Sequence, residues 1–101
     1  MLDKNTIKNI VLTFAQEVKK ILQFNAVIVF GSYVNGQPTE DSDIDVAIII
    51  NDVNIDWYNT MVKLCEIARK VNCYIEPHLI SLNNDKSGFA KHIIETGMKV
   101  A

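Results

Sequence analysis

The chain has 101 residues, of which 49% are hydrophobic, and a formal net charge of −2. This length predicts one domain, residues 1–101, with a single core and no room for the separate subdomains of a template-directed polymerase. Lysines and arginines are scattered, so the chain offers no basic surface of the kind that holds a nucleic-acid backbone, and we expect no stable nucleic-acid partner.

No hydrophobic run approaches the roughly 20 residues that a membrane helix needs, and Met1 is not followed by the hydrophobic core of a signal peptide. We therefore expect a cytoplasmic protein with no membrane contact. The two cysteines, Cys65 and Cys73, lack the spacing of a zinc or redox motif, and we expect them to be small buried hydrophobic residues.

The first half of the chain predicts one helix and two buried strands. Hydrophobic residues recur with helical period over residues 7–22, and Asp3 or Asn5 can cap this helix. The β-branched run Ala26–Phe30 predicts a buried strand, and Gly31-Ser32 ends it in a turn or short helix. The second strand, Ile44–Ile50, is too continuously hydrophobic to be exposed except at its carboxylate end.

A second helix follows residues 51–54. Two rows of hydrophobic residues indicate that it is buried over much of its circumference, which is more typical of a core helix than of a binding surface. The first row is Tyr58, Met61, Val62, Cys65 and Ala68, and Trp57, Leu64 and Val71 widen it.

The remaining chain predicts a strand, a helix and a short final strand. Residues 74–80 alternate as a strand, and Pro77 within it favours an edge position or a bulge, because proline cannot donate to a sheet ladder. Residues 87–96 form a helix that ends at Gly97, and residues 98–101 extend as a strand. The order αβ(α)βαβα predicts an α/β fold of the α+β kind, in which helices cover a small mixed sheet.

Two acidic residues stand where the second strand begins. Asp43 and Asp45 are two positions apart, so the strand period places both carboxylates on one face. Like charges held so close repel unless a cation lies between them, and Mg²⁺ is typically held by one or two carboxylates together with substrate phosphates. Gly31 and Ser32 offer backbone N–H groups and a hydroxyl to such phosphates. The implied ligand is a metal-bound nucleoside triphosphate.

Each part of this pattern has a simpler interpretation. Gly31 and Ser32 could serve only as a tight turn and a helix cap, and Glu40, Asp41, Asp43 and Asp45 could form an exposed acidic loop. The loop interpretation suits Glu40 and Asp41, but it suits Asp45 poorly, because that residue adjoins a buried strand.

The combination resembles the nucleotidyltransferase superfamily of the DNA polymerase β type, whose signature is Gly-Ser, about ten residues, and Asp-x-Asp. Here Gly31-Ser32 is followed by the ten residues 33–42 and then by Asp43-Ile44-Asp45, and Gly36 and Ser42 match as well. Minimal members often carry a basic residue before the second glycine, whereas this chain has Asn35. The resemblance implies the nucleotidyltransferase fold over nearly the whole chain.

The resemblance also implies a third carboxylate, which falls on Glu76 in the strand over residues 74–80. Glu76 would join Asp43 and Asp45 as a metal ligand or would act as the base that takes the acceptor's proton. This requires its strand to lie beside the one that begins at Asp43 and Asp45. His78 shares the face of Glu76 and either lines the site or forms only a local hydrogen bond.

By resemblance, the reaction is nucleotidyl transfer from ATP to a hydroxyl, with Mg²⁺ or Mn²⁺ held by Asp43, Asp45 and Glu76 and the phosphates held by Gly31 and Ser32. Minimal members of this size are commonly antitoxins that attach AMP to a small helical HEPN-type toxin. Two other hypotheses stay open: a module that silences its partner by binding alone, and a small-molecule (antibiotic-type) nucleotidyltransferase that completes its pocket as a dimer.

Overall fold

The structure, a computed structural model, describes residues 2–35, 43–51 and 54–101. Its helices and strands follow the predicted order, with an additional 3-10 turn after the third strand. In chain order they are α1 (Lys4–Val18), β1 (Ala26–Phe30), α2 (Ser32–Asn35), β2 (Ile44–Ile50), α3 (Trp57–Val71), β3 (Ile75–Ser81), η1 (Leu82–Asn84), α4 (Phe89–Thr96) and β4 (Met98–Lys99).

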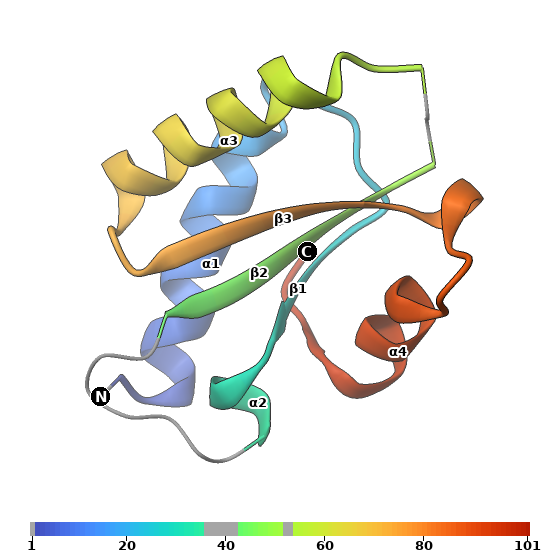
Figure 1. Cartoon of the computed structure of the whole chain (residues 1–101). Coiled ribbons are helices and arrows are strands. Elements are labelled where there is room, and N and C mark those ends of the chain that lie inside the picture. Colours follow the sequence, from blue (N-terminus) through green and yellow to red (C-terminus); the bar gives the residue numbers. More distant parts are fainter. Residues whose placement is uncertain (1, 36–42, 52–53) are drawn as a thin grey trace.

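The four strands form one mixed sheet in the order β3-β2-β1-β4 (Figure 1). β1 pairs antiparallel with β2 and with β4, whereas β2 and β3 run parallel. A parallel pair needs a crossover connection, and α3 supplies it here. This connection brings two segments about thirty residues apart in the chain into direct register, with Asp45 opposite Glu76.

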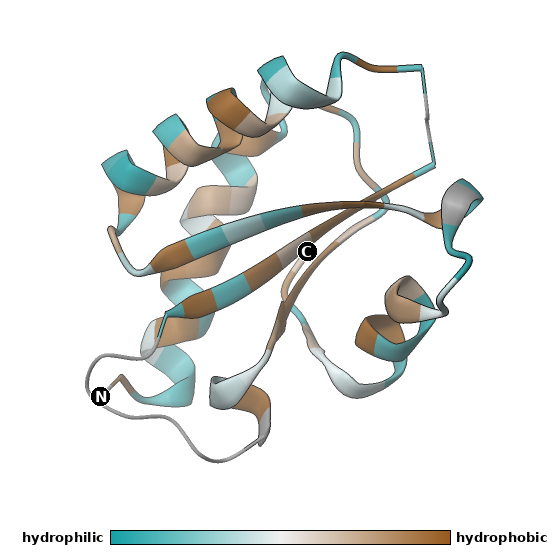
Figure 2. Cartoon of the chain, in the orientation of Figure 1, coloured by the Kyte–Doolittle hydropathy of each residue, from teal (hydrophilic) through white to brown (hydrophobic). Residues whose placement is uncertain are grey.

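Helices cover both faces of the sheet (Figure 1). α1 and α3 pack on one face, where Phe14 and Leu64 are fully buried against strand residues such as Val46. On the other face α4 buries Ile93 against a smaller group that includes Ile28 and Ile49. Colouring by hydropathy shows β2 as hydrophobic except near its beginning, where Asp45 lies (Figure 2).

The edge position expected from Pro77 is confirmed, because β3 is the outermost strand on its side. Ile44 N donates to Tyr74 O at 2.7 Å, and the backbone groups of alternate residues point the same way. Glu76 and His78 therefore direct their N–H groups at β2, and Pro77 lies where an N–H would face outward. Its missing donor removes no bond from the ladder.

The first helix is shorter than expected. It begins at the predicted cap, Asp3, whose Oδ1 accepts a hydrogen bond of 2.8 Å from Thr6 N. It ends at Val18, and the chain then turns, with Ile21 N and Leu22 N both bonding to Val18 O. Hydrophobic periodicity therefore overestimated the helix by one turn, because Leu22 packs on the core from the turn and not from the helix.

The expected wide burial of α3 is wrong. Its fully buried residues are Leu64 and Ala68, and Met61 and Val71 continue the same narrow stripe as partly buried neighbours. Tyr58 is 76% exposed and Val62 is 39% exposed. The helix contacts the sheet and α1 along one side only, and in the described part of the chain nothing covers its outer side (Figure 1).

None of these helices is a candidate membrane span. Among the described residues, no helix combines the length and the hydrophobicity that crossing a membrane requires.

Candidate functional site

The site forms where β1 ends and β2 and β3 begin. Asp45 and Glu76 are each the second residue of their strand and are direct register partners. Because β1 runs antiparallel to β2, its last residue, Phe30, lies opposite Asp45. The Gly31-Ser32 turn, which follows Phe30, is therefore at the same edge as the two carboxylates. The assignment of Glu76 as third carboxylate required its strand to lie beside the strand of Asp45, and β3 does lie beside β2.

Three side chains on one face of the sheet converge at this edge. Asp45, Glu76 and His78 place one ligand atom each within 4.8 Å of one another. His78 Nε2 lies 3.3 Å from Asp45 Oδ1. Two carboxylates and an imidazole are a donor set that suits a divalent cation. The residues present at this edge of the sheet therefore fit the metal that the sequence pattern predicts.

The surroundings of Glu76 perturb its carboxyl group. Loss of hydration raises the pKa of Glu76 from its ordinary value, and a hydrogen-bonding contact and charge repulsion with Asp45 raise that pKa further. Glu76 therefore holds a proton more readily than an ordinary glutamate does. A bound cation would remove this repulsion.

Gly31 brings the turn into contact with the carboxylate. Its φ is +80°, in the left-handed region that favours glycine. A Cβ on Gly31 would overlap Asp45 Oδ2. Ser32 then begins α2, and Val34 N donates to Gly31 O at 3.0 Å, which closes the turn. A side chain at position 31 would thus strain the backbone and would also collide with the Asp45 carboxylate.

Asp43 is not part of the three-residue cluster. It lies one residue before β2 and is exposed, although its charge contributes to the raised pKa of Glu76. Its predicted role as a metal ligand stays a prediction. Gly36, Ser42 and the loop carboxylates Glu40 and Asp41 lie outside the described residues.

Two aromatic rings adjoin the cluster and were not identified from the sequence as site residues. Phe30 meets His78 edge-on, with ring centroids 5.1 Å apart, and meets Phe89 of α4 at 6.0 Å. Position 30 could have been recognised, because Phe30 directly precedes the Gly-Ser turn. Nothing local marks Phe89, which reaches the site only because α4 packs on this face.

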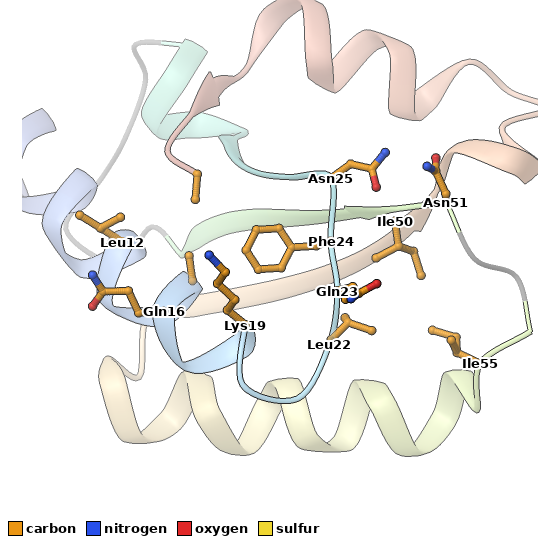
Figure 3. A pocket seen from close by; sticks show the side chains of 12 residues that line it. Leu12, Gln16, Lys19, Leu22, Gln23, Phe24, Asn25, Ile50, Asn51 and Ile55 are labelled. Carbon is orange, nitrogen blue, oxygen red and sulfur yellow. The ribbon is translucent and has the colours of Figure 1, made fainter.

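A cavity of about 810 Å³ is lined by a different set of residues (Figure 3). It adjoins Ile50, at the opposite end of β2 from Asp45, and the end of α1 at Lys19. Hydrophobic side chains and carboxamides such as Gln16 and Asn51 line it. Among the described residues this lining includes no carboxylate side chain, so the acidic cluster, and not the cavity, is the candidate site of the chemistry.

Comparison with known proteins identifies the family of this chain. The family model described as "Polymerase beta, Nucleotidyltransferase" matches residues 6–101. The chain belongs to this nucleotidyltransferase family. The match includes the turn at Gly31-Ser32, Asp43, Asp45 and Glu76.

Individual relatives are similar at low identity. The protein adenylyltransferase MntA of Thermococcus cleftensis is 26% identical over 96 residues, which cover 93% of this chain and 92% of that protein. A solved structure from Sulfolobus solfataricus, provisionally described as a nucleotidyltransferase, has a TM-score of 0.65 at 14% identity over 93% of this chain and 78% of its own. A toxin–antitoxin structure with AMP-PNP has a TM-score of 0.60 at 19% identity, covering 93% of this chain and 72% of its own. These structures show that the chain has the nucleotidyltransferase fold.

Proposed function

We propose that this nucleotidyltransferase is a protein adenylyltransferase, which moves AMP from ATP to a hydroxyl of a partner protein, and that the partner is a small helical HEPN-type toxin in the cytoplasm. The observation that carries the chemistry is the direct register of Asp45 with Glu76 beside the Gly31 turn. The MntA relative supports a protein as acceptor, and the toxin–antitoxin neighbour supports an antitoxin role.

The chain's own residues divide the work between phosphate binding and proton transfer. Gly31 and Ser32 hold the β- and γ-phosphates through backbone N–H groups and the Ser32 hydroxyl. Asp43, Asp45 and Glu76 would hold Mg²⁺ or Mn²⁺, and the bound cation would supply positive charge against the phosphates. The acceptor oxygen bonds to the α-phosphorus, the bond to the β-phosphate oxygen breaks, and pyrophosphate leaves.

Glu76 would serve either as a third ligand of the cation or as the base that takes the proton of the attacking hydroxyl. In the metal-free site, loss of hydration and the neighbouring Asp45 raise the pKa of Glu76, so its carboxyl group holds a proton more readily than an ordinary glutamate does.

The test is transfer of label from ATP carrying ³²P at the α-phosphate to the purified toxin-like partner, with Mg²⁺ or Mn²⁺ present. We expect label on the partner, and we expect Ser32→Ala, Asp45→Asn and Glu76→Gln each to reduce the rate by about a hundredfold or more. Glu66→Gln, an exposed position on α3, is the matched control and should transfer at the wild-type rate.

The two other hypotheses predict different outcomes for the same variants and for other acceptors. If the site variants still protect cells from the partner as well as wild type does, the chain acts by binding alone. If label moves to a small hydroxyl compound and none to the protein, the acceptor class is wrong and a small-molecule transferase is indicated. Measuring the chain's mass in solution then shows whether it completes its pocket as a dimer.

A further inference from the structure

His78 occupies a place in the site that the nucleotidyltransferase motif does not assign. It lies two residues after Glu76 in β3, so the strand period puts both side chains on the face that carries Asp45. Its side chain is 36% exposed and that of Asp45 is 26% exposed, so both remain accessible to a ligand.

Phe30 packs beside the His78 ring. It meets the imidazole at an interplanar angle of 65°, and Phe89 packs against Phe30 at 86°. The other side of the imidazole faces the acidic pair, with Nε2 3.3 Å from Asp45 Oδ1. The imidazole nitrogen and the carboxylate oxygen are therefore side by side before any ligand binds.

The separation of the donor atoms suits a small divalent cation. Ligands about 2.1 Å from a cation lie roughly 3 Å apart when adjacent and about 4.2 Å apart when opposite. The Nε2–Oδ1 distance of 3.3 Å is close to the adjacent value. The Glu76 carboxylate lies within 4.8 Å of both atoms, so all three ligand atoms are grouped on the scale of one coordination sphere.

We infer that His78 is a nitrogen ligand of the metal site, together with Asp45 and Glu76, and that it makes the site prefer Mn²⁺ over Mg²⁺. Mg²⁺ binds oxygen ligands almost exclusively, whereas later divalent cations accept imidazole nitrogen increasingly well along the Irving–Williams series. A site of three carboxylates would lack this nitrogen-based preference. The inference rests on the proposed function only in requiring a cation at this edge of the sheet.

The alternative role for His78 is to orient Asp45 through their hydrogen bond without touching the metal. Glutamine at position 78 distinguishes the two roles, because its amide N–H can still donate to Asp45 while its nitrogen does not coordinate a cation. His92, the other histidine of the chain, is exposed on α4 and provides the control.

The experiment uses the full chain without a histidine tag and without nucleotide. Pulsed electron paramagnetic resonance of bound Mn²⁺ should detect a directly coordinated imidazole nitrogen in wild type and in His92→Gln, and no such nitrogen in His78→Gln. Calorimetry should show Mn²⁺ affinity falling about tenfold in His78→Gln, with Mg²⁺ affinity changing less than about threefold.

Two results would overturn the inference. One is a Mn²⁺ spectrum without nitrogen coupling in wild type. The other is a His78→Gln variant whose Mn²⁺ and Mg²⁺ affinities stay equal to wild type or fall together, which assigns His78 to orientation of Asp45. Either result leaves label transfer to the partner intact, whereas nitrogen coupling without label transfer would refute the proposed function and keep the metal site.

Discussion

The α-carbon of Gly31 lies against the carboxylate of Asp45, so close that a methyl group on Gly31 would overlap Oδ2. The Gly31-Ser32 turn and the acidic pair are therefore in contact. A substitution at Gly31 acts on the proposed metal site directly as well as through the backbone.

Gly31→Ala should lose metal and nucleotide binding while the domain remains folded. Alanine at φ +80° costs about 1–2 kcal/mol of stability, and its Cβ additionally displaces the Asp45 carboxylate. Calorimetric titration with Mn²⁺ and ATP should show binding weakened at least about tenfold.

Gly88→Ala is the matched control for this substitution. Its φ is +75°, but a Cβ there would meet no atom within 4 Å. The same backbone strain should lower the melting temperature comparably and leave Mn²⁺ affinity unchanged. Equal binding by both variants would show that the contact with Asp45 does not matter for the site.

Glu76→Gln should make the metal-free protein more stable at neutral pH and not at acidic pH. The folded pKa of Glu76 is raised, so between the unfolded and folded pKa values the folded state binds more protons. Wild type therefore loses stability as pH rises through that window, and below the unfolded value there is no loss. Melting curves of both proteins from pH 4 to pH 8, in a chelator, measure the difference.

The exposed Glu95→Gln variant should follow wild type across this pH range. With saturating Mn²⁺, wild type should become more stable than Glu76→Gln. Wild type gains more from the cation by mass action than a variant with one carboxylate fewer. A pH-independent difference between Glu76→Gln and wild type would mean that the two carboxyl groups do not interact in solution.

Substitutions on the buried side and on the exposed side of α3 should have very different effects on stability. Leu64 is fully buried, so Leu64→Ala should cost about 2–5 kcal/mol of unfolding free energy. Val62 is 39% exposed, and Val62→Ala should change stability by less than about 0.5 kcal/mol. Denaturant unfolding measures both, and a comparable cost at position 62 would restore the wide burial first expected for this helix.

Asp85 caps α4 from a distance and should prove important for its stability. The N-terminal position, Gly88, has no side chain for this purpose, and Asp85 accepts hydrogen bonds from Ala90 N and Lys91 N at 2.9 and 3.1 Å. Asp85→Ala should cost about 1 kcal/mol, because both N–H groups lose their partner. Chemical denaturation checks this, with Glu95→Ala as control, and an equal cost in both variants would contradict the capping role.

The sequence predicted the features that depend on short-range pattern. The β-branched runs at Ala26–Phe30 and Ile44–Ile50 are strands, and the single proline in the third strand correctly indicated an edge. Placing Glu76 beside Asp45 was a longer inference, since it needed the family resemblance to choose among possible strand orders.

The burial of α3 and the contacts around the site depend on tertiary packing, which the spacing of hydrophobic residues in the sequence does not determine. The spacing of hydrophobic residues along α3 cannot show that Tyr58 faces away from the core, because the width of the buried stripe depends on how many neighbours surround the helix. His78 could be placed on a face, but its contacts with Asp45 and Phe30 follow from the three-dimensional arrangement. Phe89 is near the site only through the docking of α4.

Both borders of the sheet discourage the addition of another strand. On one side Pro77 removes a donor from the outer row of β3, and on the other β4 offers only two residues, Met98 and Lys99. Self-association by edge-to-edge pairing, the usual route to strand-swapped assemblies and fibrils, is thus disfavoured. Recognition of the proposed protein partner should consequently depend on side chains of the helices and turns, where surface sequence can diverge without disturbing the ladder.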